Sequence, residues 1–364
     1  MIRKHASSLR RFFSERTHRN EVAGAVVLTE HTEPIRTTVE HSRVLMSGTQ
    51  LAEALGGHFE GDVLCRGSWC ARPPQVHGKD DRFDLIAVAE ALAVPMAHEV
   101  TEDGPVVALA QPAEAWALAQ SLTAPDVELE SLDGSPVRLS NWEGRRRVLL
   151  AFGSWCACRE DLPVWQRVVD SLPDGSGVEL IAIAVDDSAA DVHPFVDGIA
   201  FPVLLDRDRR FCDTYGVIHV PTVVWIDEAD CIVRPNAVVF ADDRLRAHHG
   251  LDASVHHDAL RRWVVDGVPP VERTEVRSHQ MPPTPAEQQA RAEFRLARWL
   301  LRQGRREQAV QHVDRAGELS PEDLTIRRAG LKLLGGDPFG PEFGPIYQDW
   351  KRSSGNRYYR ARPS

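Results

Sequence analysis

The sequence has no hydrophobic run long enough to cross a membrane, and its basic start is not followed by the apolar stretch of a secretory signal. A spanning helix needs roughly 18 or more apolar residues in a row, and no such run occurs. A signal peptide needs about 7–15 apolar residues after its positive charges, and the basic lead at residues 1–20 precedes none. We therefore expect a cytoplasmic protein without membrane contact.

An excess of positive charge is also missing, because 43 Lys and Arg face 53 Asp and Glu in a chain of 364 residues. The net charge of −10 gives no general case for binding nucleic acid and mainly favours solubility. The length exceeds what one compact core holds and predicts two or three domains. No segment implies a bound organic cofactor or a resident metal, so we expect neither.

Shifts in composition and hydrophobic periodicity divide the chain after the basic lead. We expect a small α/β domain of unknown role at 21–118, a second α/β domain at 119–267, a Pro-rich linker at 268–283, helices at 284–335 and an irregular tail at 336–364. Thr284-Pro285 places Pro at the first turn of the helical region. This organisation puts the chemistry-bearing motifs in the middle of the chain.

Each α/β domain shows short apolar runs next to helical patterns. In the first we expect strands at 25–28, 39–45 and 106–109 and helices at 51–55 and 85–92, the second helix capped by Asp84. In the second we expect strands at 148–152, 178–185, 201–205 and 223–226, a hairpin partner at 231–233 and a helix at 160–172. Strand–helix–strand followed by a hairpin is an α/β plan with a mixed central sheet.

Cysteine is scarce, and its placement is informative. In a reducing cytoplasm the six cysteines are not expected to form a structural disulfide framework, and cysteines close in sequence point to catalysis or metal binding. Cys156 and Cys158 lie between a buried strand and a helix, within Trp155-Cys156-Ala157-Cys158-Arg159. A helix N-terminus lowers the pKa of a thiol, and Arg159 adds positive charge. The pair is therefore the candidate redox centre.

At this point the sequence resembles the TlpA/ResA-like thioredoxin-fold (redoxin) family. The resemblance covers about 150 residues and is carried, in order, by Ala124-Pro125-Asp126, Asp133-Gly134, Leu139-Ser140-Asn141, Phe152 to Pro163, Val203-Leu204-Leu205-Asp206 and Tyr215 to Thr222. It implies a thioredoxin fold for 119–267, a cis Pro221 facing the reactive cysteine, and a substrate groove formed by Trp155, Val220, Pro221 and Thr222. Pro163 matches the kink proline of the active-site helix, and Asp161 stands where the family usually has Glu.

The spacing of the cysteines departs from that family, which has two residues between them where this chain has only Ala157. A ResA-like group with the pattern W-A-x-x-U-G-C, where U is selenocysteine, is similar in spacing to Phe152-Gly153-Ser154-Trp155-Cys156-Ala157-Cys158. This similarity implies that Cys156, at the selenocysteine position, attacks the substrate and that Cys158 resolves the product.

The short spacing constrains the resolving step. Residues two apart on a helix point about 200° apart, so a Cys156–Cys158 bond requires Cys156 to lie in the loop before the helix. The small ring is expected to be strained, and strained disulfides are more oxidising. Two outcomes stay open: a readily reduced Cys156–Cys158 bond, or a monothiol cycle in which another thiol resolves Cys156.

We expect a thiol–disulfide oxidoreductase that takes a protein or small-molecule disulfide and is recycled by a thiol reductant. A thiol peroxidase that first oxidises Cys156 to sulfenic acid is the main alternative. An inert thioredoxin scaffold and a Cys-x-Cys metal site are weaker alternatives. The pentapeptide Gly67 to Ala71, which contains Cys70, repeats Gly153 to Ala157 without a following helix. Cys65 and Cys70 are either buried or incidental cysteines or an accessory pair that exchanges with Cys156.

The helical region suggests a further, non-catalytic role. The spacing of a tetratricopeptide-like helix pair is carried by Leu296, Ala297, Leu300, Gly304, Ala309, Val313, Ala316 and Pro321. One such pair cannot bury its own face, so we expect it to pack on residues 322–334 or on the redox domain. It serves either as a docking surface for a protein partner, which would make the chain an adaptor, or as an intramolecular brace.

Overall fold

A computed structural model of the chain describes residues 23–29, 33–40, 43–76, 81–112, 116, 121–173 and 175–354, so the basic lead lies outside the described residues. The chain forms two compact units. The first contains residues up to Gln120 together with Pro282–Ser320, and the second contains Ser121–Met281 together with residues from Pro321 onward. Among the described helices, none has the length and apolar character that a membrane crossing requires.

The first unit is built on a six-stranded sheet in the order β7-β3-β2-β1-β9-β8, in which only β1 and β9 pair in parallel. Its strands are β1 (Ala23–Leu28), β2 (Ile35–Glu40), β3 (Arg43–Ser47), β7 (Arg82–Asp84), β8 (Met96–Thr101) and β9 (Gly104–Leu109). The single strand expected at 39–45 is wrong, because Val39 belongs to β2 and pairs antiparallel with Val44 of β3.

Two short helices close one part of this core, as the sequence predicted. α2 (Gly48–Leu55) begins with a capping box in which the Ser47 hydroxyl accepts the Gln50 N–H and the Gln50 side chain accepts the Ser47 N–H. α3 (Leu85–Ala91) begins at Asp84, whose carboxylate accepts the Ile86 N–H. Each cap satisfies donors that the first helical turn leaves unpaired. The apolar faces of both helices are buried with the sheet.

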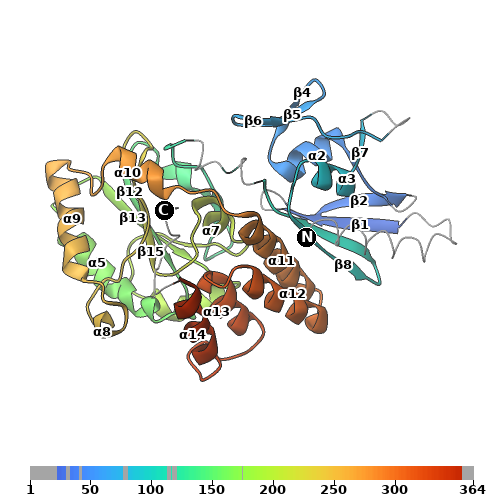
Figure 1. The fold of residues 1–364 in the computed structure, drawn as a ribbon. Helices are drawn as coiled ribbons and strands as arrows, with labels where there is room; N and C mark the ends of the chain where they lie inside the picture. The colour runs from blue at the N-terminus through green and yellow to red at the C-terminus, as the bar shows by residue number, and fades with distance from the viewer. Residues whose placement is uncertain are drawn as a thin grey trace. The chain divides into compact units, whose positions relative to one another are not determined.

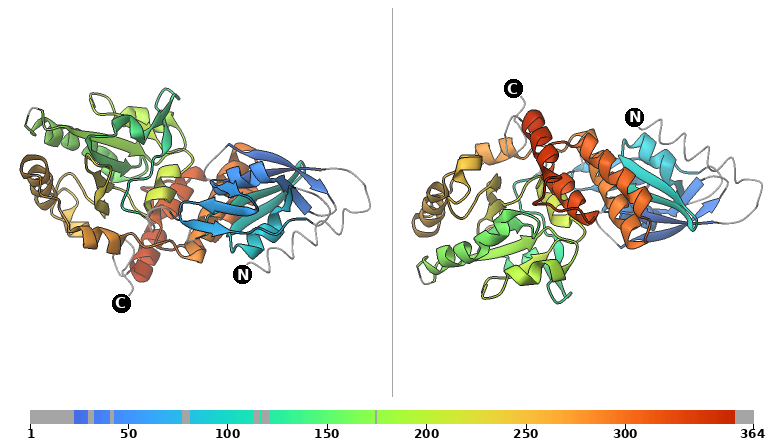
Figure 2. Two further views of the ribbon diagram at one scale, coloured as in Figure 1. Left: turned by 90° about the horizontal axis from the view of Figure 1, so that it is seen from above. Right: turned by 90° about the horizontal axis from the view of Figure 1, so that it is seen from below.

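The helix pair α11 (Pro285–Arg302) and α12 (Arg306–Leu319) completes the first unit. Figures 1 and 2 show the helix pair beside the sheet of this unit, and α11 packs against β8 and β9. The Gln289 side chain donates to the Met96 carbonyl, and Arg295 donates to the Leu109 carbonyl. The expected packing on residues 322–334 or on the redox domain is therefore wrong, because α11 covers the sheet of the first unit. The contacts of α11 with β8 and β9 fit an intramolecular brace, and a docking surface for a protein partner stays a prediction.

A partly buried histidine, His312, joins α12 to its neighbours in this unit. His312 Nδ1 lies 2.6 Å from a carboxylate oxygen of Glu293 on α11, and its Nε2 lies 3.5 Å from a carboxylate oxygen of Glu99 on β8. Burial favours the neutral ring, but the hydrogen bonds to Glu293 and Glu99 outweigh it and raise the pKa of His312 to about 9. The charged ring therefore stabilises the folded unit at neutral pH.

The stability of the chain is expected to fall when this histidine loses its proton. A pKa raised in the folded state gives stability that is complete below the unfolded pKa near 6.5 and is lost as the pH rises through about 9. Denaturant unfolding should therefore show a loss of at most about 3 kcal/mol between pH 7 and pH 10 from this group. His312→Gln, which cannot be charged, serves as the control. An equal pH dependence in both proteins would contradict the assignment.

The second unit has a seven-stranded mixed sheet in the order β11-β10-β14-β13-β12-β15-β16, with parallel pairs only at β12–β13 and β13–β14. Its strands are β10 (Glu128–Ser131), β11 (Pro136–Arg138), β12 (Arg146–Phe152), β13 (Val178–Ala184), β14 (Val203–Leu205), β15 (Thr222–Ile226) and β16 (Ile232–Val238). Every strand expected in this domain is confirmed, and so is the mixed α/β plan.

Helices cover both faces of this sheet. Figure 1 shows α5 (Leu162–Asp170) and α9 (Ala253–Asp266) on one side of the strands and α7 (Arg210–Tyr215) on the other. Trp263 of α9 stacks on Trp225 of β15, which fixes that helix to the sheet. The short helices η2 (Leu139–Trp142), η3 (Ala157–Asp161), α6 (Ala189–Val192), η4 (His193–Phe195) and α8 (Arg246–His249) lie in the connections. The central strands are buried on both faces.

Two expectations about the end of the chain are wrong. The linker predicted at 268–283 contains α10 (Arg273–His279), which packs against β16, and the tail predicted to be irregular contains α14 (Phe343–Ser354). The expected single segment 284–335 is also divided, because α13 (Leu324–Leu333) belongs to the second unit. There the Leu324 N–H donates to the Ile218 carbonyl, and the buried Arg209 donates to the backbone and side-chain oxygens of Thr325.

Candidate active site

Cys156 lies just after the C-terminal end of β12 and immediately before η3. Its backbone is extended, with φ −118° and ψ 145°, so it is the N-cap of η3 and not part of the helix. The requirement that Cys156 stand in the loop before the helix is therefore met. The Cys158 N–H donates to the Cys156 sulfur at 3.4 Å, as an N-cap acceptor would receive it. Pro163 follows in the first turn of α5, where its missing N–H costs nothing.

The two thiols are deeply buried and differ in acidity. Cys156 is 5% exposed and Cys158 is 1% exposed. A hydrogen bond from the Cys158 side chain lowers the pKa of Cys156, burial opposes this, and the positive charge of Arg328 lowers it further. Burial raises the pKa of Cys158 well above its ordinary value, and its partner Cys156 adds to the increase. The arrangement therefore favours a thiolate at Cys156 and a neutral thiol at Cys158.

The loop before β15 lies against the Cys156 sulfur. The Val220–Pro221 peptide bond is cis, as the resemblance implied, and the Val220 carbonyl oxygen lies 3.5 Å from Cys156 Sγ. The Thr222 hydroxyl donates to the His219 carbonyl and closes the loop. Burial lowers the pKa of His219 to about 3, so its ring is neutral beside the thiols. The structure thus brings Val220 and Pro221 to Cys156, and a role in substrate binding stays a prediction.

Trp155 and Asp161 both point into the protein. Trp155 is 3% exposed and donates its indole N–H to the Val185 carbonyl, and its place in a substrate groove stays a prediction. Asp161 accepts the Ala241 N–H and pairs with Arg244 at 2.8 Å. Burial raises the pKa of Asp161 to about 6 despite these partners. Its negative charge opposes ionisation of Cys158.

Arg159 has a partly exposed side chain at the edge of this centre. It donates to the Ser154 carbonyl at 2.7 Å, and its guanidinium stacks on Phe195 and on Phe339. The aromatic rings and the carbonyl fix the guanidinium close to the turn that carries both cysteines. The side chain therefore helps to hold the loop before η3, a contact that the sequence did not reveal.

A polar cluster beneath the loop was missed by the sequence analysis. The buried Asp186 carboxylate accepts hydrogen bonds from the Ser154 N–H at 2.9 Å and from the Ser154 hydroxyl at 2.6 Å. Lys332 of α13 donates to Ser154 Oγ at 2.7 Å and to Asp186 at 3.0 Å, and it pairs with Asp191. This cluster fixes the backbone two residues before Cys156. Its members are far apart in sequence, and no motif links them.

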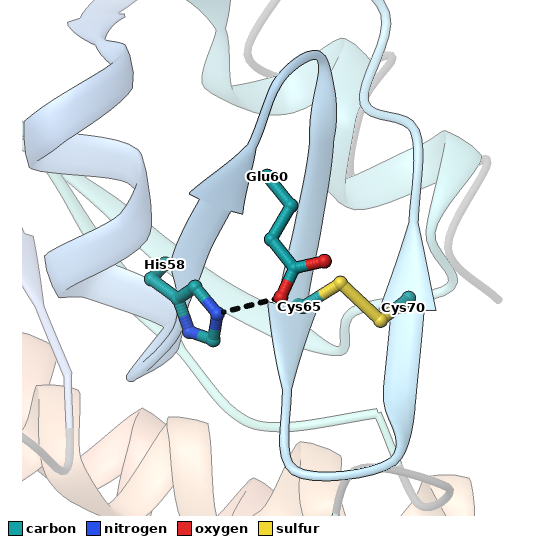
Figure 3. Close-up of a disulfide and its surroundings, with 4 residues drawn as sticks. All are labelled: His58, Glu60, Cys65 and Cys70. Carbon is teal, nitrogen blue, oxygen red and sulfur yellow. Dashed lines mark hydrogen bonds and ion pairs between the residues drawn. A yellow bond between two sulfur atoms is a disulfide. The ribbon is translucent and has the colours of Figure 1, made fainter.

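Cys65 and Cys70 form a disulfide in the first unit. Figure 3 shows it joining β5 (Val63–Arg66) to β6 (Trp69–Ala71), beside an ion pair between His58 and Glu60 of β4 (His58–Glu60). The expectation that these cysteines form no disulfide is wrong, because direct opposition on antiparallel strands places their side chains on one face. Such bonds are typical of oxidising compartments. Exchange with Cys156 and the cytoplasmic location both stay predictions.

The other cysteines are free thiols away from the reaction centre. Cys212 is completely buried on α7, and burial raises its pKa well above the ordinary value, which fits a core residue. The Cys231 N–H donates to the Asp227 carboxylate in the turn before β16. Within the described ranges, no group of three or more His, Cys, Asp or Glu side chains is arranged to hold a metal ion.

Part of this chain is similar to known proteins. A family model described as the AhpC/TSA family matches residues 121–243. The thiol-disulfide oxidoreductase ResA of Geobacillus thermodenitrificans is 32% identical over 118 residues, which are 32% of this chain and 67% of that protein. ResA of Bacillus subtilis is 32% identical over 120 residues, covering 32% and 66%.

Solved structures of thioredoxin-like proteins also match a part of this chain. A thioredoxin-like protein from Porphyromonas gingivalis is 27% identical, covers 40% of this chain and 94% of its own, and has a TM-score of 0.33. The match to the curated relatives spans about two thirds of their length.

Proposed function

This chain belongs to the AhpC/TSA family through its thioredoxin-like domain, and from that premise we propose that it is a thiol–disulfide oxidoreductase whose reaction centre is Cys156-Ala157-Cys158. The observation that carries the proposal is the placement of the two thiols, with Cys156 at the N-cap of η3 and the Cys158 N–H donating to its sulfur at 3.4 Å. Cys156 has a lowered pKa at the N-cap of η3, and Cys158 has a raised pKa and donates to it. A nucleophile and a protonated resolving group therefore stand side by side.

The reaction follows from these two states. The Cys156 thiolate attacks one sulfur of a substrate disulfide, a mixed disulfide forms, and the leaving thiolate takes up a proton. Cys158 then loses its proton and attacks the Cys156 sulfur, which releases the second substrate thiol and leaves a Cys156–Cys158 disulfide. An external thiol reductant returns both cysteines to the reduced state. The hydrogen bond from the Cys158 side chain to Cys156 supports the resolving step despite the single intervening residue.

The order of the two cysteines is tested by trapping the intermediate. In Cys158→Ser, Cys156 still attacks the substrate disulfide, but no second thiol resolves the product. A mixed disulfide at Cys156 should therefore accumulate when the substrate disulfide is supplied without a dithiol reductant. Mass spectrometry of non-reduced peptides identifies it. In the wild-type protein the same treatment should yield a Cys156–Cys158 bond. A mixed disulfide on Cys158 in Cys156→Ser, with none on Cys156 in Cys158→Ser, would reverse the assignment.

A thiol peroxidase is a second candidate, favoured by the burial of Cys156. A cysteine that is only 5% exposed is reached more easily by a small peroxide than by a folded protein. The peroxide would break its O–O bond on the Cys156 thiolate and leave a sulfenic acid, which Cys158 would convert to the disulfide with release of water. Sulfenic acid at Cys156 of Cys158→Ser, formed faster than the mixed disulfide at equal oxidant concentration, would favour this activity.

A further inference from the structure

Helix α13 crosses the reaction centre from one side to the other. At its start the Leu324 N–H donates to the Ile218 carbonyl, two residues before Val220, and two turns later Lys332 donates to Ser154 Oγ. The sulfur of Cys156 lies between these anchor points, since it contacts Val220 and follows Ser154 by two residues. Arg328 stands midway, one turn from each anchor. The helix therefore places Arg328 at the level of Cys156.

The guanidinium of Arg328 is held by aromatic rings and a carbonyl. Its carbon lies 4.0 Å from the Phe343 ring centroid and 5.0 Å from that of Phe339, and its Nε donates to the Pro338 carbonyl at 3.0 Å. Phe339 also stacks on Arg159, which follows Cys158 directly. Two guanidinium groups thus share one ring beside the cysteines. These contacts fix the orientation of Arg328 without neutralising it.

Arg328 has no carboxylate within ion-pair distance among the residues that the structure describes. Its side chain is half-buried, and a cation removed from water without an anion is costly. Most neighbouring cations are paired: Lys332 with Asp186, Arg327 with Asp349 and Arg244 with Asp161. At this position the anion that can balance the charge of Arg328 is the Cys156 thiolate.

We infer that Arg328 is a positioning residue of the reaction centre, whose charge holds the Cys156 sulfur in its anionic form. The inference rests on the proposed function and extends it, because Arg328 lies well outside residues 121–243, which match the family. The thiolate is then maintained by a helix that the family domain does not contain. The direction of the shift at Cys156, to which Arg328 contributes, agrees with this geometry.

Other charged groups act on the same sulfur and limit the expected effect. Cys158 on η3 stabilises the thiolate through its hydrogen bond, and Asp161 on the same element opposes it. Arg159 is paired with Glu160 and stacked on two rings. His219, next to Val220, is neutral above a pH of about 3. Arg328 is therefore the group whose removal changes the charge at Cys156 without touching η3.

The test is the pH profile of Cys156 alkylation in the full chain. Iodoacetamide reacts with the thiolate, and tandem mass spectrometry separates Cys156 from Cys158. Arg328→Gln should move the midpoint of the profile to higher pH and slow alkylation about tenfold below the midpoint. Arg328→Lys, which keeps the charge, should restore most of the rate. Arg352→Gln, an exposed arginine of α14, should leave the profile unchanged.

Several results would overturn the inference. One is an Arg328→Gln variant that has a native circular dichroism spectrum and an unchanged midpoint of the Cys156 alkylation profile. Another is a midpoint shift in Arg328→Lys as large as that in Arg328→Gln. If Arg328→Gln does not fold, Phe339→Leu replaces it, because Phe339 is 47% exposed and holds the guanidinium. That variant should show a smaller shift in the same direction, and no shift would count against Arg328. Alkylation does not depend on turnover, so failure of the proposed oxidoreductase activity would be seen separately.

Discussion

Replacing Cys156 by serine is expected to lower kcat/KM for disulfide reduction by more than about a thousandfold, because a hydroxyl at this position is not ionised at neutral pH. The substitution removes one sulfur atom from a buried site that accepts the Cys158 N–H, and a serine oxygen can accept the same hydrogen bond. The fold should therefore persist while the chemistry stops. The measurement is steady-state reduction of a disulfide by the purified protein with a thiol donor.

The matched control for this loss is Cys231→Ser. Cys231 is a free cysteine in the second unit, it is partly exposed, and it lies on the turn before β16 away from Val220. Its replacement should leave the rate within about twofold, since surface substitutions change stability little. If Cys156→Ser kept more than a tenth of the wild-type rate, another thiol would be the nucleophile. The Cys65–Cys70 pair would then be examined next, in a Cys156→Ser background.

The local part of the active site was predictable from sequence because its signals are contiguous. A buried strand, two cysteines and a helix with an early proline follow one another in residues 146–170, and the structure has β12, η3 and α5 there. The requirement that Cys156 lie outside the helix followed from helical geometry alone, and its extended backbone meets it. The cis peptide at Pro221 followed from the resemblance, and the structure has it.

The remote part could not be predicted, because nothing in the sequence marks its pairings. Arg328 and Lys332 are ordinary basic residues on an amphipathic helix, which by default reads as a solvated face. The partners of Lys332, Ser154 and Asp186, are more than a hundred residues away in the chain. The last helix, α14, was also missed: the Gly and aromatic residues of the last thirty positions suggested an irregular tail, whereas burial of Trp350 stabilises a helix.

The prediction of a single helical segment at 284–335 was wrong, because it grouped helices that are consecutive in the sequence. Residues 284–335 form one continuous run of helical patterns, and a repeat was the natural interpretation. In the structure α11 and α12 complete the sheet of the first unit, while α13 belongs to the second. The hydrogen bonds from Gln289 to Met96 and from Leu324 to Ile218 show these separate attachments. Burial of its apolar face against a particular sheet determines the unit to which a helix belongs. Local periodicity carries no information on which sheet that is.

The pairing of Lys332 with Asp186 leads to a second large effect. Lys332→Met is expected to lower the free energy of unfolding by about 3 kcal/mol, because it leaves the Asp186 carboxylate, whose side chain is completely buried, without a cation. Burial already raises the pKa of Asp186, and the lysine charge works against that increase. Denaturant unfolding at neutral pH, followed by circular dichroism, measures the change. The loop before Cys156 should loosen at the same time, since Ser154 loses one of its partners.

A double substitution separates the charge from the packing. In Lys332→Met/Asp186→Asn no charge remains in the cluster, and the asparagine can still accept the Ser154 N–H, so more than half of the lost stability should return. Lys351→Met on α14 is the matched control, because Lys351 is exposed and stacks only on Tyr347; it should change stability by less than about 0.5 kcal/mol. A double variant no more stable than Lys332→Met would show that α13 is held by packing around the lysine stem. A double variant close to wild type would show that Lys332 stabilises the chain by neutralising the buried Asp186 carboxylate.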